Sequence, residues 1–413
     1  MPSDPAVPFD SIISLAAHLV SIPSRAGIDP TAPVLNAAAA WLTQHGLPPT
    51  WLRNAQERPV ALLVRIDGAE PGPAICLNAC IDTAPFGDEN RWRLSPTAGV
   101  VDGGKLWGRG AADSKMGVAI LSHVAHFLAT TAALPRGTVY VLFDADEHTG
   151  EFGGVKAFLK QASPKPQAAA LGYPGDDSLT LGSRGFLRVK LHVSGQSGHS
   201  GAVTDRGVNA ISKAAALVAA IDSRPPQGAA DTLFAFGPCA TVTRIEGGEG
   251  FSQIPDRVAC NLDIRLTPGF DHEAAHAWLG AIIDHVDAAL PSPGPTRIEP
   301  VEHWPPYAVA TDHPLVTAFL QASRQSFGHD LPPLVCGPSN IGNYLAAHGV
   351  ATICAPGVAC ANIHGTDECA DLSTVSSVYK MYCAAVPDFL QRCAAVTPGS
   401  AGVSPAHVRQ GFA

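Results

Sequence analysis

Acidic residues and histidines follow several predicted buried strands, where an enzyme could do chemistry. Asp82 ends the apolar run AICLNACID, while Glu147 and His148 end VLFDADEH. Asp113 follows a glycine-rich segment just before a predicted helix, and His364 lies in a loop after another strand. Singly, each is more simply a cap or a turn residue. Together they predict one polar cluster, because open α/β sheets build their sites at the carboxyl ends of the strands.

The segments that must position this cluster alternate between strands and helices. Alternation of this kind predicts an α/β fold, with a mostly parallel sheet covered by helices on both faces. The predicted buried strands are VALLVRI, PAICLNACID, GTVYVLFDADE and VATICAPG. The predicted helices are FDSIISLAAHLV, APVLNAAAAWLTQHG, SKMGVAILSHVAHFLATTA, HPLVTAFLQASRQSF and the closing STVSSVYKMYCAAVPDFLQRC.

From about residue 184 the pattern changes to polar and apolar residues in alternation. GFLRVKLHVSG and VACNLDIRLTPG are typical of strands with one face in water, and two helical segments accompany them. This order predicts a small inserted α+β domain. The polar residues 397–413 are predicted to form a mobile tail.

Composition narrows the class of protein. The chain has 413 residues and a net charge of -9, which disfavours binding to nucleic acid. The N-terminus lacks the basic start and apolar run of a secretory signal, and no apolar stretch reaches the roughly 18 residues of a membrane span. The 10 cysteines show no CxxC pairs. We therefore expect a cytoplasmic protein without membrane contact or disulfides.

Several longer motifs point to one enzyme family. DGGKLWGRGAADSKMG, DADEHTGEFGG, SGHSGAVTDRGVNAI and NIHGTDE occur in this order. The chain resembles, over nearly its whole length, the family of dinuclear zinc hydrolases that includes aminoacylase, acetylornithine deacetylase, succinyl-diaminopimelate desuccinylase and glutamate carboxypeptidase. The resemblance implies a catalytic domain at residues 1–183 and 298–413, and an inserted dimerisation or lid domain at 184–297. It also implies a homodimer that cleaves the amide bond of a small N-acyl amino acid or a dipeptide-like carboxylate.

The resemblance also implies roles for residues of the polar cluster. Asp113 matches the carboxylate that bridges two metal ions, and His364 matches the terminal ligand of one of them. Glu147 resembles the general base that takes a proton from water and passes it to the leaving amine. Asp82 resembles a carboxylate that orients a metal ligand.

Three further residues have implied roles. His199, in the inserted domain, resembles a residue that reaches the partner subunit's site and stabilises the oxyanion. Arg265 resembles a contact to the substrate carboxylate, and a strand-end ion pair is an equal alternative. Asn340 stands where the family has an aspartate, and we expect it to contact substrate.

The chain departs from the family at the metal ligands. Cys80 replaces a histidine and Tyr173 replaces an acidic residue, both in the first metal site. Both would have to ionise to bind a metal, so the first site is predicted to be lost. His148 replaces a glutamate of the second site, which keeps Asp113 and His364. Two imidazoles and a carboxylate suit one catalytic zinc ion, or non-haem iron.

The sequence leaves three functions open. The first is a hydrolase with one zinc ion on Asp113, His148 and His364, with Glu147 as the base. The second is a metal-independent enzyme, in which Glu147 and His148, together with Cys80 and Tyr173, do acid–base or nucleophilic work. The third is a binding protein that keeps the cleft without turnover. Metal content and the effect of chelation on activity distinguish the three.

Overall fold

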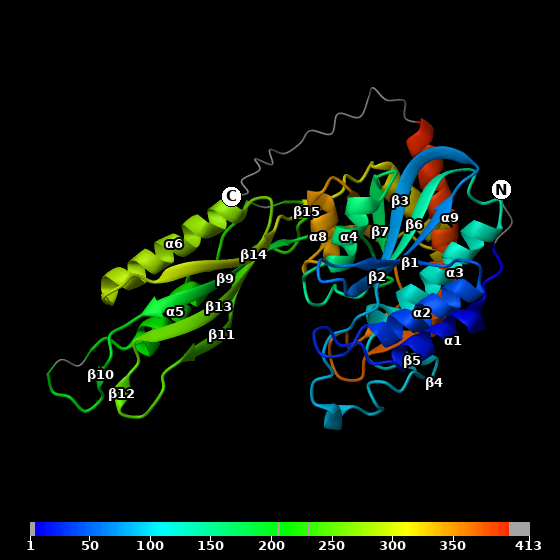
Figure 1. The fold of residues 1–413 in the computed structure, drawn as a ribbon. Helices are drawn as coiled ribbons and strands as arrows, with labels where there is room; N and C mark the ends of the chain where they lie inside the picture. The colour runs from blue at the N-terminus through cyan, green and yellow to red at the C-terminus, as the bar shows by residue number, and fades with distance from the viewer. Residues whose placement is uncertain (1–4, 205–206, 230, 396–413) are drawn as a thin grey trace. The chain divides into compact units, whose positions relative to one another are not determined.

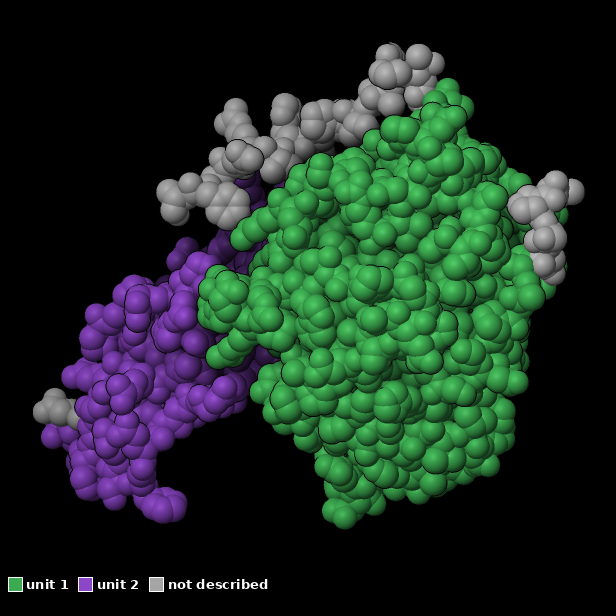
Figure 2. Space-filling view, turned by 45° about the vertical axis from the view of Figure 1, so that its right-hand side comes forward, with its two compact units in different colours: residues 1–177, 311–331, 355–413 green, residues 178–310, 332–354 purple. Residues whose placement is uncertain are grey.

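A computed structural model describes residues 5–204, 207–229 and 231–395, and the predicted tail at 397–413 lies outside them. The chain forms two compact units, which Figure 2 colours separately. Unit 1 contains Met1–Asp177, Thr311–Leu331 and Ala355–Ala413, and unit 2 contains Ser178–Ala310 and Pro332–Cys354. Unit 2 therefore extends beyond residues 184–297, and the predicted domain boundaries stay a prediction.

Unit 1 is built on a mixed sheet whose central strands are parallel. The central strand β3 (Glu70–Cys80) runs parallel to β6 (Arg136–Asp144) on one side and to β7 (Ala168–Leu171) on the other. Strand β2 (Pro59–Asp67) joins β6 in the antiparallel direction, and β1 (Thr50–Arg53) is antiparallel to β2. β6 and β7 are buried over almost their whole length, as parallel strands covered on both faces must be.

Helices cover this sheet, as Figure 1 shows. Both α3 and α9 pack against β3, whereas α4 packs against β1, β2 and β6. The α/β prediction is confirmed, and so are the five helices predicted for this part of the chain. The five are α1 (Phe9–Val20), α2 (Ala32–Gln44), α3 (Met116–Thr130), α7 (Pro314–Phe327) and α9 (Val375–Ala395), and α4 (Gly153–Gln161) was not predicted.

A small antiparallel sheet in unit 1 brings two distant loops together. Its strand order is β18-β19-β5-β4. Because β19 pairs with β5, the loop after β5 lies beside the loop between β18 and β19. The strands are β4 (Val100–Asp102), β5 (Lys105–Trp107), β18 (Cys360–Ala361) and β19 (Cys369–Asp371), and short helical turns lie at Glu89–Arg91, Ala111–Lys115 and Leu372–Thr374.

Unit 2 contains a four-stranded antiparallel sheet in the order β11-β13-β9-β14. Apolar residues of β9 and β13 alternate toward helices α5 and α6, with which they form one buried core. The elements are β9 (Gly185–Ser194), α5 (Ala210–Ser223), β11 (Cys239–Gly247), β13 (Arg257–Leu266), α6 (His272–Ala289) and β14 (Arg297–Trp304). The predicted alternating strands and both helices are confirmed.

Unit 2 also contains shorter elements. β10 and β12 form a two-stranded ladder, and β8 pairs with β15, β16 and β17. These elements are β8 (Leu179–Ser183), β10 (Gly198–His199), β12 (Gln253–Ile254), β15 (Tyr307–Ala308), β16 (Pro333–Cys336), α8 (Ile341–Ala347) and β17 (Ala351–Cys354).

No helix of the described residues is both long enough and apolar enough to span a membrane.

A buried ion pair joins α5 to α6. Lys213 Nζ lies 2.9 Å from Asp287 Oδ1, and the lysine side chain is 1% exposed. Replacing Lys213 with alanine leaves a partly buried carboxylate without its cation, so we expect a loss of about 3 kcal/mol in the free energy of unfolding, measured by urea denaturation. Lys190→Ala, which removes a half-exposed pair with Glu299, is the control and is expected to cost under about 1 kcal/mol. Equal losses in the two variants would contradict this expectation.

Candidate metal and catalytic site

The three predicted metal ligands converge on one point in unit 1. Asp113 Oδ2 lies 3.0 Å from His364 Nε2 and 3.6 Å from His148 Nε2, and the two Nε2 atoms lie 3.2 Å apart. Donor atoms about 2.0–2.1 Å from a zinc ion lie about 3.3 Å apart at the corners of a tetrahedron. The three distances therefore match the spacing of ligands around one ion.

Asp113 is held by the turn that precedes α3. Glu368 accepts hydrogen bonds at Oε1 from the backbone N–H groups of Gly110, Ala112 and Asp113, over 3.0 to 3.1 Å. Gly110 adopts a φ of 83°, a left-handed conformation that glycine allows at little cost. The glycine-rich sequence before Asp113 therefore lets three backbone N–H groups of this turn donate to the buried carboxylate of Glu368.

A buried arginine joins this turn to the loop that carries His364. Arg109 Nη1 lies 2.5 Å from Glu368 Oε2, and both side chains are almost fully buried. Arg109 Nη2 donates to the carbonyl oxygens of His364 and Gly365, over 3.1 and 3.0 Å. His364 itself is 54% exposed at its side chain, so solvent reaches this edge of the site.

Sequence reasoning assigned no role to Arg109 or Glu368. Both lie inside motifs that carried the family resemblance, GRGAADSKMG and NIHGTDE. Their opposite charges within these two motifs are the one signal that could have drawn attention to them. We assign them the positioning of Asp113 and His364.

Asp82 positions the loop after β6. Its carboxylate is fully buried and accepts hydrogen bonds from the backbone N–H groups of Glu147 (3.3 Å) and His148 (2.9 Å). Asp146 lies in the same motif but turns away from the cluster. Its side chain accepts from Thr149 and from the backbone of Gly153, so it caps a turn. Of the DADEH residues, Glu147 and His148 face the site.

The charges of the cluster are strongly coupled. Burial raises the pKa of the Asp113 carboxyl, but hydrogen bonds from His148 and His364 outweigh burial and hold this pKa well below its usual range. Burial lowers the pKa of His148, yet its contacts with Cys80 and with the carboxylates of Asp113 and Asp82 raise this pKa well above its usual range. Without a metal, Asp113 and His148 therefore form an ion pair.

Glu147 is a buried carboxyl group beside His148. Burial raises its pKa to about 7, opposed by the neighbouring His148 charge and by a hydrogen bond to Tyr173. Its Oε2 lies 3.4 Å from His148 Nδ1. A carboxyl group with a pKa near the working pH both accepts and returns a proton readily.

The two substituted positions lie at the edges of this cluster. Cys80 ends β3 with its side chain fully buried, and its Sγ lies 3.8 Å from Asp113 Oδ1 and 3.1 Å from Ser114 Oγ. Burial raises the pKa of the Cys80 thiol well above its ordinary value. A buried, neutral thiol is a poor nucleophile, which weighs against the metal-independent alternative.

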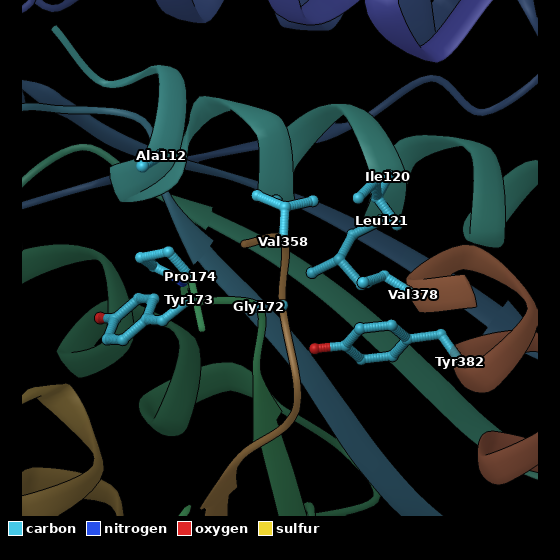
Figure 3. A pocket seen from close by; sticks show the side chains of 11 residues that line it. Ala112, Ile120, Leu121, Gly172, Tyr173, Pro174, Val358, Val378 and Tyr382 are labelled. Carbon is cyan, nitrogen blue, oxygen red and sulfur yellow. The ribbon is translucent and has the colours of Figure 1, made fainter. Parts of the chain in front are cut away.

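Tyr173 borders a small cavity behind the cluster. The cavity lies between α3, the segment after β7, and α9, and its lining is mainly apolar. Figure 3 shows the Tyr173 hydroxyl pointing away from it, whereas Tyr382 points its hydroxyl toward it. A volume of about 10 Å³ holds at most about one water molecule, so this cavity is too small for substrate.

The remaining predicted site residues belong to unit 2. His199 is exposed in the short ladder of β10 and β12. Arg265 pairs with Asp263 over 2.7 Å and donates to Ser339, so the strand-end ion pair considered from the sequence is present. Asn340 caps α8 by accepting from the backbone of Gly342. Their predicted roles toward substrate stay predictions.

Known proteins resemble this chain in sequence and in fold. The model of Peptidase family M20/M25/M40 matches residues 76–388. A succinyl-diaminopimelate desuccinylase of Methylocella silvestris is 25% identical over 310 residues, covering 73% of this chain and 78% of that protein. One from Rhodopseudomonas palustris is 28% identical over 329 residues, covering 75% and 81%. The M20 metallo-carboxypeptidase Sso-CP2 from Sulfolobus solfataricus has a TM-score of 0.76 at 14% identity, over 92% of this chain and all of that one.

Proposed function

Because the chain belongs to Peptidase family M20/M25/M40, we propose that it is a metal-dependent amide hydrolase whose catalytic site holds a single zinc ion. Relatives named as desuccinylases and peptidases cleave amide bonds. The observation that carries the single-ion site is the convergence of Asp113, His148 and His364 at mutual distances of 3.0 to 3.6 Å. This set of one carboxylate and two imidazoles suits zinc.

The residues of this site divide the work of hydrolysis. A bound ion would polarise the scissile carbonyl and acidify water. Glu147, with a pKa raised to about 7, accepts the proton of the attacking water at a carboxylate oxygen and delivers it to the leaving amine nitrogen. Asp82 holds Glu147 and His148 in place through their backbone N–H groups.

The proposed substrate is a small N-acyl amino acid or a dipeptide-like amide that carries a carboxylate. The desuccinylase relatives support an N-acyl substrate, and Arg265 and Asn340 are proposed to contact it. An assay of N-acyl amino acids and dipeptides, with zinc restored after chelation, tests this proposal. Turnover that survives complete chelation would favour the metal-independent enzyme. We also propose that the protein is cytoplasmic, and cell fractionation would test this.

Glu147 gives the reaction a defined pH dependence. We expect kcat/KM to fall as the pH is lowered from about 7 to about 5, because protonation removes the base. The same raised pKa favours the folded state at low pH, where the enzyme is least active, because the carboxyl group ionises near 4.5 in the unfolded chain and near 7 in the folded one. The contribution of Glu147 to folding is therefore lost as the pH rises through 7. A pH profile with no acidic limb would contradict the assignment.

We also propose a homodimer formed through unit 2. Strand β11 lies at the edge of its sheet and is largely exposed. Ile245 on β11 is 51% exposed, and a groove of about 640 Å³ runs between β11 and α5, lined by Val218 and Val242 among others. Exposed edge strands and apolar surfaces are typical of protein interfaces. A second copy of the chain is the proposed partner.

Mixed dimers of two variants can test whether His199 acts in the site of the partner subunit. If His199 acts in the partner's site, Glu147→Gln and His199→Ala chains are each inactive alone, while their mixed dimers contain one complete site. Refolding the two variants together is expected to restore about a quarter of wild-type activity, because half of the dimers are mixed and each has one working site of two. No recovery would contradict action across the subunits.

A further inference from the structure

We propose that Cys80, Asp82 and His148 form a second ligand set, for a buried divalent ion of the zinc class. Cys80 Sγ, an Asp82 carboxylate oxygen and a ring nitrogen of His148 all lie within 4.8 Å of one another. The inference rests on the proposed function in one respect, since both ions share His148. Its Nε2 would bind the catalytic ion and its Nδ1 the second.

The first argument is the environment of His148 Nδ1. This nitrogen is buried, on a side chain that is 7% exposed, and it has no hydrogen-bond partner among the described residues. Glu147 Oε2 lies 3.4 Å and Asp82 Oδ2 lies 3.5 Å away, whereas N–H···O hydrogen bonds span about 2.7–3.2 Å. Two atoms that bind one zinc ion lie about 3.3 Å apart. The separation therefore fits a shared ion better than a direct hydrogen bond.

The second argument is charge. The side chains of Cys80 and Asp82 are both fully buried, and an isolated buried charge is strongly unfavourable. A divalent ion would be neutralised by one thiolate and one carboxylate. Binding would release the thiol proton of Cys80 and the remaining ring protons of His148, as ligation requires.

The third argument is ligand chemistry. Thiolate and imidazole favour zinc and cobalt over magnesium and calcium. Because Cys80 and Asp82 are fully buried, substrate cannot reach an ion held between them. The second ion would therefore be structural, fixing the end of β3 to the loop that carries Glu147 and His148.

Cobalt titration of the chelator-treated full chain tests the inference. A cobalt–thiolate bond gives a charge-transfer band in the near ultraviolet, whereas nitrogen and oxygen ligands give only the visible bands. We expect both kinds of band in the wild-type protein, and loss of the near-ultraviolet band alone in Cys80→Ser. Cys76→Ser is the matched control, because Cys76 is also buried and lies four residues earlier on the same strand. It is expected to keep both.

The outcomes separate this inference from the proposed function. Visible bands without a near-ultraviolet band in the wild-type protein would overturn the second ligand set and leave the catalytic site standing. A near-ultraviolet band that persists in Cys80→Ser would also overturn it. Absence of every band would overturn both. X-ray absorption of the zinc-loaded wild-type protein needs no variant, and a sulfur neighbour at about 2.3 Å is the expected result.

Discussion

Replacing Glu147 with glutamine is expected to lower kcat by about 10³-fold while leaving the bound metal in place. Glutamine has nearly the same shape but cannot accept a proton at its side-chain oxygen and hand it on. Glu147 is the carboxyl group whose pKa burial raises to about 7, and it lies beside the converging metal ligands without being one of them. Steady-state kinetics on the best N-acyl substrate, with metal analysis of the same sample, measures both effects.

The control for this variant lies in the same motif. Asp146 caps a turn and does not face the site, so Asp146→Asn is expected to reduce kcat far less than Glu147→Gln. A Glu147→Gln enzyme that keeps more than about a tenth of wild-type kcat would contradict the proposed base, because general acid–base catalysis contributes about 10²–10⁴-fold.

Replacing His364 with alanine is expected to abolish metal-dependent activity. His364 Nε2 lies 3.0 Å from Asp113 Oδ2 and 3.2 Å from His148 Nε2, so its loss removes one of three proposed ligands. Removing a residue that only supports a ligand costs about 10–100-fold in metal affinity, and loss of a ligand itself is expected to cost more. The side chain is 54% exposed, so the fold should tolerate the change.

The matched control removes an imidazole elsewhere on unit 1. His329 is exposed and lies outside the cluster, so His329→Ala is expected to keep both metal and activity. Circular dichroism of both variants checks that they fold. A His364→Ala enzyme that retained full activity after chelation would favour the metal-independent alternative.

Much of the fold could be predicted because its signals are local. Apolar runs that end in acidic residues predicted β3 and β6, and helical periodicity predicted α3 and α9. Strand direction is a different matter. The VALLVRI segment is buried like its parallel neighbours but runs antiparallel in β2, because pairing partners are chosen by long-range contacts that a single segment does not encode.

The sequence was enough to predict which residues of the candidate site come together. Asp113, His148 and His364 are far apart in sequence, yet strand-end positions and motifs predicted that they meet, and they do. The buried pair of Arg109 and Glu368 was missed, because charged residues in a glycine-rich loop look like solvated surface until the loop is folded.

Cys80 illustrates what sequence could not decide. From its neighbours in sequence alone it resembled a buried strand residue, beside Asp82 and far from any base. The fold places its sulfur near Asp113 and His148, which come from other segments. The predicted loss of the first metal site, which followed from the need to ionise this thiol, stays a prediction. It concerns the ligand set of the family and does not exclude Cys80 from binding a metal with other ligands.

The most direct test of the central claim is the metal content of the wild-type protein beside His364→Ala, both purified without chelator and loaded with zinc. The account predicts that the wild-type protein holds one ion per chain more than the variant, and that activity on N-acyl substrates follows this ion. Equal metal content in the two proteins, with equal activity, would contradict it.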